Sequence, residues 1–194
     1  MLAYVFWHWK RPGVSAEEYE ARQRAFHGAL ADAPPDGFQQ STCHALAGAP
    51  WAAHGADAYE DRYLVTDSSA LDALNAGAVS ASRSAPHDAA AAAAAGGTAG
   101  LYTLQSGSML GAARVAYCFS KPDGMRYAEL FALLAPLTSA SSSALWMRYM
   151  TLGPAPEFCL QTTEPVDVPA PIATHRLDLR SVFSGRGADR QRAR

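Results

Sequence analysis

The pattern of hydrophobic and polar positions divides the chain into alternating strand-like and helix-like segments. Leu2 to Trp9 are mostly β-branched or aromatic, which is typical of a strand buried on both faces. Hydrophobic positions then recur at helical spacing from Tyr19 to Ala29, after a capping box formed by Ser15 and Glu18. The same reading predicts strands at Phe38–Leu46, Ala58–Val65 and Gly100–Ser106, and helices from Asp67 to Ala78 and from Pro86 to Gly97.

The second half repeats this order in reduced form. It predicts strands at Val115–Ser120, Leu145–Leu152, Phe158–Thr163 and His175–Phe183, and one helix at Met125–Leu137. A proline-rich stretch, Pro165 to Pro171, stands where a second helix would be. A short pattern, aromatic-x-aromatic-x-cation-Pro, also occurs twice, at Trp7–Pro12 and Tyr117–Pro122. We therefore expect a β-α-β-β-α-β unit over residues 1–108, a degenerate copy over 109–184, and a disordered basic tail over 185–194.

The amino-acid composition limits the kinds of molecule that this protein is expected to bind. Of the 194 residues, 49% are hydrophobic and 18% charged, which is a globular composition, and the net charge of -2 gives no reason to expect a nucleic-acid partner. The longest apolar run, Ala89–Ala95, is too short to span a membrane, and no secretion signal is visible at the start. Three cysteines lie far apart without metal-binding spacing, which favours a reducing, cytoplasmic location.

The first half resembles a known family at the end of its first helix. The segment Phe26-His27-Gly28-Ala29-Leu30, followed by Pro35-Asp36-Gly37-Phe38, is similar to the EthD-like branch of the dimeric α+β barrel superfamily, although that branch often has proline where this chain has Ala29. The resemblance implies an α+β fold in which two ferredoxin-like units pack sheet to sheet as an intramolecular barrel. It also implies a pocket in each half for a flat, largely apolar molecule.

Members of this superfamily include cofactor-independent monooxygenases, polyketide cyclases, muconolactone isomerase-like enzymes, haem-dependent chlorite dismutases and proteins without known activity. Shared fold alone does not decide between them. One hypothesis is therefore a cofactor-free enzyme acting on a small aromatic or polyketide-like molecule, as a monomer or homodimer. The other is a non-catalytic protein that binds a hydrophobic ligand or supports an assembly, and a haem protein is the third.

His27 is the predicted catalytic residue, because imidazole titrates near neutrality and the family match places this histidine at the pocket mouth. Its structural alternative is a cation in the last helical turn, and on that view His27→Ala should leave the fold intact. His8 lies on the same strand face as Tyr4 and Phe6. It faces the pocket if that face lines the barrel, and is otherwise a hydrogen-bonded core histidine.

Further candidate ligand-binding residues come from the other strands. His44 forms a polar stripe with Gln40 and Thr42, which is either a ligand-facing wall or a buried polar layer. Aromatic and cationic side chains that could contact a ligand are Tyr63, Tyr102 and Arg148, with core packing or surface ion pairs as the alternatives.

The remaining motifs give no cofactor site. The histidines are scattered without HxH or HExxH spacing, so no metal and no cofactor is predicted, although a single axial histidine would suffice for haem. The pair His87-Asp88 opens a helix, where side chains at i and i+1 are not expected to face each other, so we interpret Asp88 as serving the helix N-terminus. The glycines from Gly96 to Gly100 are interpreted as a helix C-cap and turn.

Overall fold

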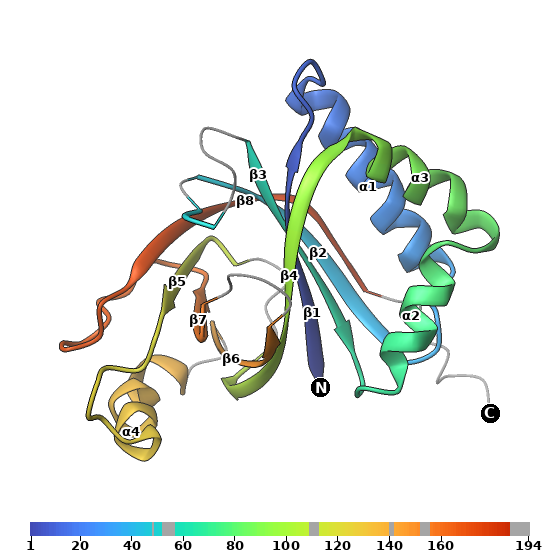
Figure 1. Cartoon of the computed structure of the whole chain (residues 1–194). Helices are drawn as coiled ribbons and strands as arrows, with labels where there is room; N and C mark the ends of the chain where they lie inside the picture. Colours follow the sequence, from blue (N-terminus) through green and yellow to red (C-terminus); the bar gives the residue numbers. More distant parts are fainter. Residues whose placement is uncertain (48, 52–56, 109–112, 140–141, 152–155, 187–194) are drawn as a thin grey trace.

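Eight antiparallel strands close into a barrel with helices packed on its outside (Figure 1). The structure is a computed structural model, and it describes residues 1–47, 49–51, 57–108, 113–139, 142–151 and 156–186. Around the barrel the strands follow the order β1-β3-β2-β8-β5-β7-β6-β4. No helix within these ranges is long and apolar enough to cross a lipid bilayer.

The N-terminal half supplies four neighbouring strands of the barrel and most of its helices. Its elements are β1 (Leu2–Lys10), α1 (Ala16–Asp32), β2 (Phe38–Leu46), β3 (Ala58–Val65), α2 (Ala70–Ala78), a 3-10 turn (Ala81–Arg83), α3 (Ser84–Ala93) and β4 (Ala94–Gly107). Ser15 caps α1 by accepting a hydrogen bond from the Glu18 backbone N–H, as the capping pattern predicts. Helices α1, α2 and α3 cover the outer face of these strands (Figure 1).

The C-terminal half supplies the other four strands. Its elements are β5 (Val115–Phe119), α4 (Tyr127–Thr138), β6 (Ser143–Thr151), β7 (Phe158–Thr162) and β8 (His175–Arg186). The two halves meet where β2 pairs with β8 and where β4 pairs with β6, both antiparallel. In both halves the fourth strand lies beside the first, the first beside the third, and the third beside the second.

Every strand has one face inside the barrel, and the outer layer covers the other face over much of the sheet. Along β8 the outward side chains of Arg176, Asp178 and Arg180 are exposed instead. Inside, an apolar cluster joins residues of both halves, including Trp7, Tyr102 and Trp146. Outside the N-terminal half, Phe26 and Leu30 of α1 pack on the sheet. Outside the C-terminal half, α4 and the proline-rich segment share that role, with the packed side chains Leu130, Leu134, Val166, Val168 and Ile172. This division explains why strands such as β1 are hydrophobic on both faces.

Three sequence expectations need correction. The alanine helix ends at Ala93, and Ala94 to Gly107 form one long strand, so Gly96 and Gly97 lie within β4 rather than in a turn. Strand β8 continues to Arg186, because Gly185 and Arg186 pair with β2, so the expected tail does not begin at residue 185. Residues 187–194 lie outside the described ranges.

The third correction concerns the repeated aromatic pattern. Both copies end a strand that precedes a helix, but their aromatic residues face opposite sides of the barrel wall. Trp7 lies in the inner cluster, whereas the corresponding Tyr117 lies in the outer cluster under α4. A shift of one residue along a strand reverses its faces, so the two copies are not structurally equivalent.

Candidate functional site

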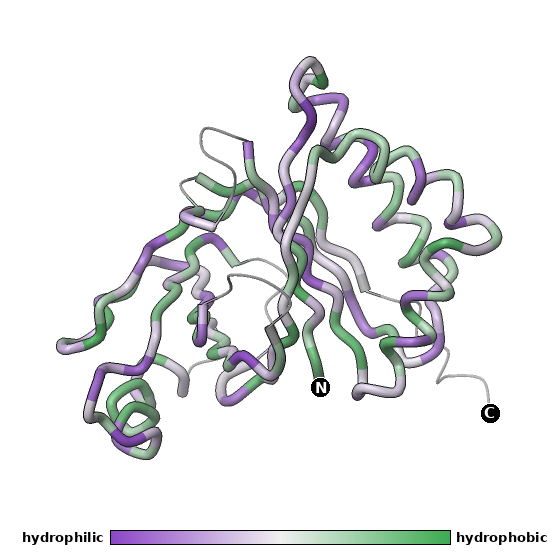
Figure 2. The backbone as a smooth tube through the Cα atoms, in the orientation of Figure 1, coloured by the Kyte–Doolittle hydropathy of each residue, from purple (hydrophilic) through white to green (hydrophobic). Residues whose placement is uncertain are grey.

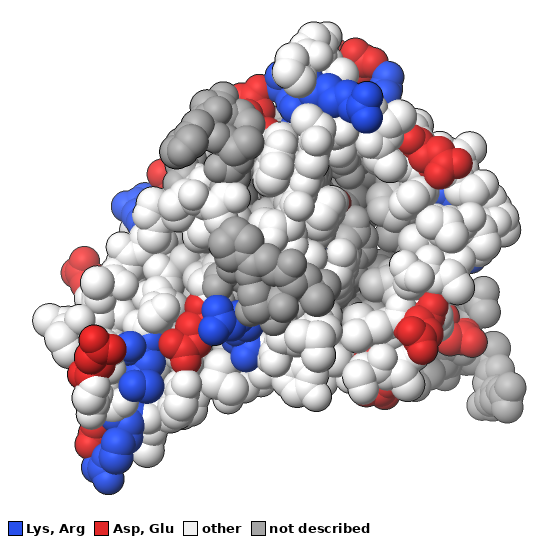
Figure 3. Space-filling view, viewed as in Figure 1, with Lys and Arg blue, Asp and Glu red and all other residues white. Residues whose placement is uncertain are grey.

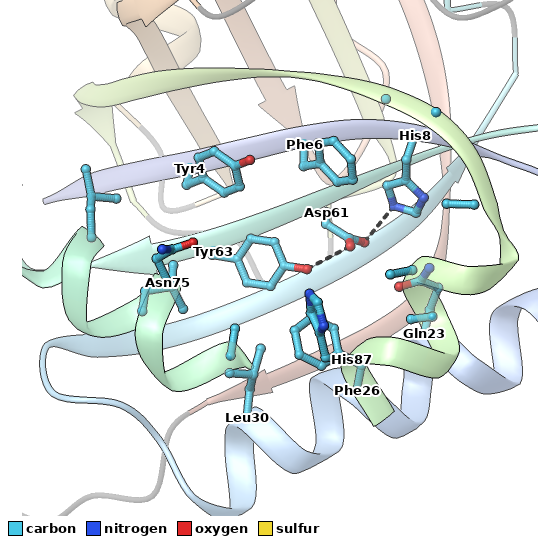
Figure 4. A pocket seen from close by; sticks show the side chains of 18 of the residues that line it. Tyr4, Phe6, His8, Gln23, Phe26, Leu30, Asp61, Tyr63, Asn75 and His87 are labelled. Atoms are coloured by element: carbon cyan, nitrogen blue, oxygen red, sulfur yellow. Dashed lines mark hydrogen bonds and ion pairs between the residues drawn. The ribbon is translucent and has the colours of Figure 1, made fainter. Parts of the chain in front are cut away.

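A cavity of about 740 Å³ lies between the outer face of the N-terminal sheet and helices α1, α2 and α3 (Figure 4). Aromatic side chains form much of its wall, namely Tyr4, Phe6, Phe26 and Tyr63. The wall along α3 and the start of β4 is built largely from small residues, among them Ala90, Ala91, Ala94, Ala95 and Gly97. The alanine-rich stretch of the sequence is therefore what leaves room for the cavity.

The mouth of this cavity is largely uncharged. On the face seen in Figure 3, the molecule is hollowed beside β4, and the atoms around the hollow are mostly those of uncharged residues. Charged side chains gather at the edges of this face, over the β1–α1 turn and near α4 (Figure 3). The volume and the apolar wall suit an uncharged organic molecule of moderate size.

Strand alternation brings the polar residues of the sheet wall together. Tyr4, Phe6 and His8 alternate along β1, and Asp61 and Tyr63 alternate along β3. The antiparallel register places Tyr4 opposite Tyr63 and Phe6 opposite Asp61. His8 and Asp61 are therefore diagonal neighbours on the outer face of the sheet, within reach of each other.

Asp61 is the centre of a buried polar network. Its Oδ1 lies 3.2 Å from Nε2 of His8, and its Oδ2 accepts a hydrogen bond of 2.8 Å from the Tyr63 hydroxyl (Figure 4). The same Oδ1 also lies 3.2 Å from Nε2 of His27. The two imidazole contacts are ion-pair distances whose angles fall outside good hydrogen-bond geometry. One carboxylate thus faces two rings and a phenol in a site that is almost closed to water.

The network keeps Asp61 ionised. Burial by itself would raise the pKa of this carboxyl, but His8 and His27 outweigh burial and hold it well below its usual value of 3.8. The same carboxylate acts on the hydroxyl beside it. Burial, followed by the charge of Asp61, raises the pKa of Tyr63 well above 10.0, so Tyr63 stays a neutral donor.

His8 has both ring nitrogens engaged. Its Nδ1 lies 2.5 Å from the hydroxyl of Tyr19 on α1, and its Nε2 faces Asp61. Burial raises the pKa of Tyr19, so this phenol is protonated and donates to Nδ1. The ring of Phe6 stacks against His8 with centroids 5.2 Å apart. His8 therefore has a fixed orientation in the cavity wall. The two alternatives predicted for it both apply, since it faces the pocket and is also a hydrogen-bonded, buried histidine.

His27 lies behind the wall rather than in it. Its side chain is fully buried, with Nδ1 2.8 Å from the Ser41 hydroxyl and the ring stacked on Tyr63 at 5.2 Å. It also stacks on Phe183 of β8. Helix α1 continues to Asp32, so His27 is not in the last turn, and the expectation that it lies outside the core is wrong.

A second histidine faces the cavity, from the helix side. His87 of α3 lines the cavity, and its ring meets Phe26 edge-on with centroids 5.4 Å apart. Its Nδ1 lies 3.0 Å from Oδ1 of Asp88. The expectation that these neighbouring side chains do not meet is therefore wrong. Helix α3 begins at Ser84 and has no acidic residue in its first turn, so the interpretation of Asp88 as serving the helix N-terminus is also wrong.

His44 and its polar stripe lie inside the barrel, not in the cavity. Beside them Glu60 accepts hydrogen bonds from Trp7 (2.9 Å) and Arg62 (3.0 Å). Both Glu60 and Arg62 belong to the hydrophilic middle of β3 (Figure 2). Burial lowers the pKa of His44 below 6.5, so its ring is neutral. The sequence predicts that this stripe is either a ligand-facing wall or a buried polar layer. Its position inside the barrel corresponds to the buried polar layer.

The other predicted ligand-binding residues lie apart from this cavity. Tyr102 points into the barrel and donates a 2.6 Å hydrogen bond to the carbonyl of Pro156. Arg148 lies on β6 of the other half with an exposed side chain. The structure thus brings His8 and Tyr63 together in one wall, places His27 directly behind it, and separates His44, Tyr102 and Arg148 from it.

Three potential metal ligands lie within this network. His8, Cys43 and Asp61 offer ligand atoms within 4.8 Å of one another. Burial, followed by the charge of Asp61, raises the pKa of the Cys43 thiol well above 9.0. The carboxylate is already in contact with two imidazoles and a phenol. The contacts of Asp61 with His8, His27 and Tyr63 therefore account for its burial without a metal ion.

Comparisons with known proteins agree on the fold. No protein-family profile matches the sequence, and no curated protein matches it significantly. A candidate monooxygenase from Fusobacterium nucleatum matches over 95% of this chain and 94% of its own, with a TM-score of 0.65 at 10% identity. An anthrone oxidase-like protein matches over 100% and 96%, with a TM-score of 0.61 at 11% identity. A candidate monooxygenase from Lactobacillus acidophilus matches over 95% and 96%, with a TM-score of 0.58 at 9% identity. The chain therefore has the dimeric α+β barrel fold of these proteins, and identities this low show the fold alone.

Proposed function

We propose that this protein is a cofactor-independent oxygenase that acts on a flat aromatic molecule bound in the cavity of the N-terminal half. The observation that carries the proposal is the cavity wall itself, where aromatic rings lie beside the His8–Asp61 pair. The likeness to candidate monooxygenases and to an anthrone oxidase-like protein supports this class of reaction.

The distribution of polar groups suggests the substrate class. Asn75 of α2 lies at one end of the cavity, and His8 and Gln23 lie at the other, with the rings of Tyr63 and Phe6 between them (Figure 4). This arrangement suits a molecule of several fused rings with oxygen substituents at its ends. Anthrone has such a flat framework of three fused rings, with its carbonyl and its acidic CH₂ group opposite each other on the central ring.

The geometry supplies a route for the first proton. Tyr19 lines the cavity and donates to Nδ1 of His8, so a substrate proton can reach the Tyr19 oxygen while the Tyr19 proton passes to His8. Asp61 would then stabilise the imidazolium, because its carboxylate is ionised and lies 3.2 Å from the other ring nitrogen. His8 is therefore our candidate for the base, and His27 for a positioning residue that holds Asp61. The alternative that His27 is itself the base stays a prediction.

Proton removal makes the rest of the reaction possible without a resident cofactor. The carbanion transfers an electron pair to O₂ and forms a C–O bond, which gives a peroxide. Loss of water from the peroxide leaves a carbonyl group. For anthrone the balance is one anthrone and one O₂ giving one anthraquinone and one water.

Anthrone and an oxygen electrode test this proposal directly. The wild-type protein should consume O₂ and form anthraquinone faster than the spontaneous reaction, and His8→Gln should reduce the rate about 100-fold or more. His44→Gln is the matched comparison, because His44 is equally buried but faces the barrel interior. If His8→Gln keeps wild-type turnover, the assignment of the base is refuted. If the wild type binds anthrone without consuming O₂, the protein is a non-catalytic binder.

We further propose that the barrel derives from two ferredoxin-like units, an EthD-like one over residues 1–108 and a reduced one over 109–184. The shared strand order of the two halves supports this origin. Because the barrel closes within one chain, we propose a monomer as the functional unit. Light scattering on the purified protein would test this state, and an obligate dimer would contradict it.

A further inference from the structure

The three histidines around the site differ in which ring nitrogens are available to a ligand. His8 and His27 each have one nitrogen beside Asp61 and the other beside a hydroxyl, of Tyr19 and Ser41 respectively. His87 instead has Nδ1 beside Asp88, and its Nε2 has no partner among the described residues. His87 is thus the cavity histidine whose ring can meet a ligand directly.

The position of His87 is complementary to that of His8. It belongs to α3 and points into the cavity from the helix side, opposite the sheet wall that carries His8 and Asp61 (Figure 4). Its side chain is 32% exposed, so it can exchange protons with solvent, whereas the His8 side chain is only 1% exposed. Asp88 fixes the ring orientation, because a carboxylate at Nδ1 leaves Nε2 directed elsewhere.

The last step of the proposed reaction requires two groups at once. A base must take the remaining C–H proton while the O–O bond breaks, and an acid must protonate the departing hydroxide. The two atoms concerned are the ring carbon and the distal peroxide oxygen. One imidazole cannot serve both in the same step, so a second proton-transfer group is needed.

We propose that His87, oriented by Asp88, is the general acid that protonates the departing oxygen when the peroxide collapses; this role rests on the proposed oxygenase function. His8 takes the first substrate proton through Tyr19, and the carbanion adds to O₂. The peroxide anion then recovers that proton from His8 through Tyr19. In the final step His8 takes the second C–H proton, the C=O bond forms, the O–O bond breaks, and His87 gives its Nε2 proton to the hydroxide, which leaves as water. His8 then releases the second proton through Tyr19 to solvent in the cavity, and solvent reprotonates His87, so both histidines return to their starting states.

Two measurements on anthrone separate this role from the first step. Without O₂, in D₂O, exchange of the methylene hydrogens reports only proton removal by the His8 relay. With O₂, anthraquinone formation reports the complete reaction, and mass spectrometry detects any released hydroperoxide. We expect His87→Gln to keep the exchange rate within about twofold, to slow quinone formation about 100-fold, and to release hydroperoxide. Asp88→Asn should also slow quinone formation, but only about 10-fold, because it orients the imidazole and does not itself donate the proton.

Control variants and outcomes make the test decisive. His175→Gln, on β8 and outside the cavity, should behave as wild type in both assays. Added imidazole should partly restore quinone formation to His87→Ala, since the side chain lies at an open position. Wild-type quinone formation in His87→Gln would overturn the inference while leaving the oxygenase function intact. Equal loss of exchange and quinone formation would also overturn it, by showing that His87 only holds the substrate. Absence of both activities in the wild type would instead refute the oxygenase function.

Discussion

Replacement of Asp61 by Asn tests the network on which the site depends. The side chains have the same shape, but Asn lacks the charge that faces His8 and His27, and its NH₂ group would meet groups that donate in the native network. Three buried groups would lose a charged acceptor, and leaving a buried donor unsatisfied costs about 1–3 kcal/mol, so we expect the unfolding free energy to fall by about 3–5 kcal/mol. For a domain of this size that corresponds to a fall in Tm of about 6–20 °C.

The pH dependence of this effect has a defined sign. The folded-state pKa of Asp61 is lowered below 3.8, so the folded state favours the ionised form. The stabilisation is therefore complete above the unfolded pKa and is lost as the pH falls through the folded value. Urea unfolding of wild type and Asp61→Asn should give a constant difference from pH 7 down to about pH 5, which shrinks only below about pH 4.

A surface pair provides the comparison for this experiment. Asp178 pairs with Arg176 on β8 but is 68% exposed, so Asp178→Asn should cost less than about 1 kcal/mol. If Asp61→Asn unfolds within 1 kcal/mol of wild type at pH 7, the 3.2 Å contacts do not form a stabilising ion pair. The proposed role of Asp61 toward His8 would then also fail.

Two further substitutions test the cavity wall and the barrel interior. A Cβ at Gly97 would collide with the ring of Phe6 and lie 2.8 Å from the Trp7 carbonyl oxygen, so Gly97→Ala should lower the unfolding free energy by about 1–3 kcal/mol and weaken anthrone binding by pushing Phe6 into the cavity. A thermal melt and a fluorescence titration measure the two effects, and unchanged binding would show that Phe6 does not border the ligand. Glu60→Gln leaves the Arg62 cation buried without its counter-charge, so urea unfolding should show a loss of about 3–5 kcal/mol; a loss below 1 kcal/mol would mean that Arg62 finds other partners.

Periodicity in the sequence predicts the barrel wall well but not the start of β4. The observed bounds of β2 and β3 agree with the predicted ones, because turn-forming residues such as Gly37 before β2 and Asp67 after β3 limit them in the sequence. The alanine and glycine run before Leu101 has no such pattern. Gly96 and Gly97 belong to a strand because they pack against the rings of Trp9 and Phe6, which are distant in sequence. Contacts between residues distant in sequence produce no periodic pattern in the local sequence, so the start of β4 could not be predicted from it.

The site was only partly predictable for a related reason. Sequence reasoning selected His8, His27 and Tyr63 but missed Asp61, the residue that joins them. The available signal was the run Glu60-Asp61-Arg62 inside an otherwise apolar strand, since a buried charge needs a partner. Alternation sends Asp61 to the outer face and its two neighbours into the barrel. Which histidines meet it depends on the packing of α1, and that is fixed only in three dimensions.

The filled outer face of the C-terminal half has a consequence for stoichiometry. Where the N-terminal half has a cavity, α4 and the proline-rich segment pack Leu134, Val166 and Ile172 onto the sheet. Among the described residues, side chains therefore fill the place in the C-terminal half that corresponds to the cavity of the N-terminal half. Calorimetric titration with anthrone should therefore saturate at one equivalent per chain and follow a simple hyperbola. We expect no cooperativity between the two halves, because the corresponding place in the C-terminal half is filled by side chains.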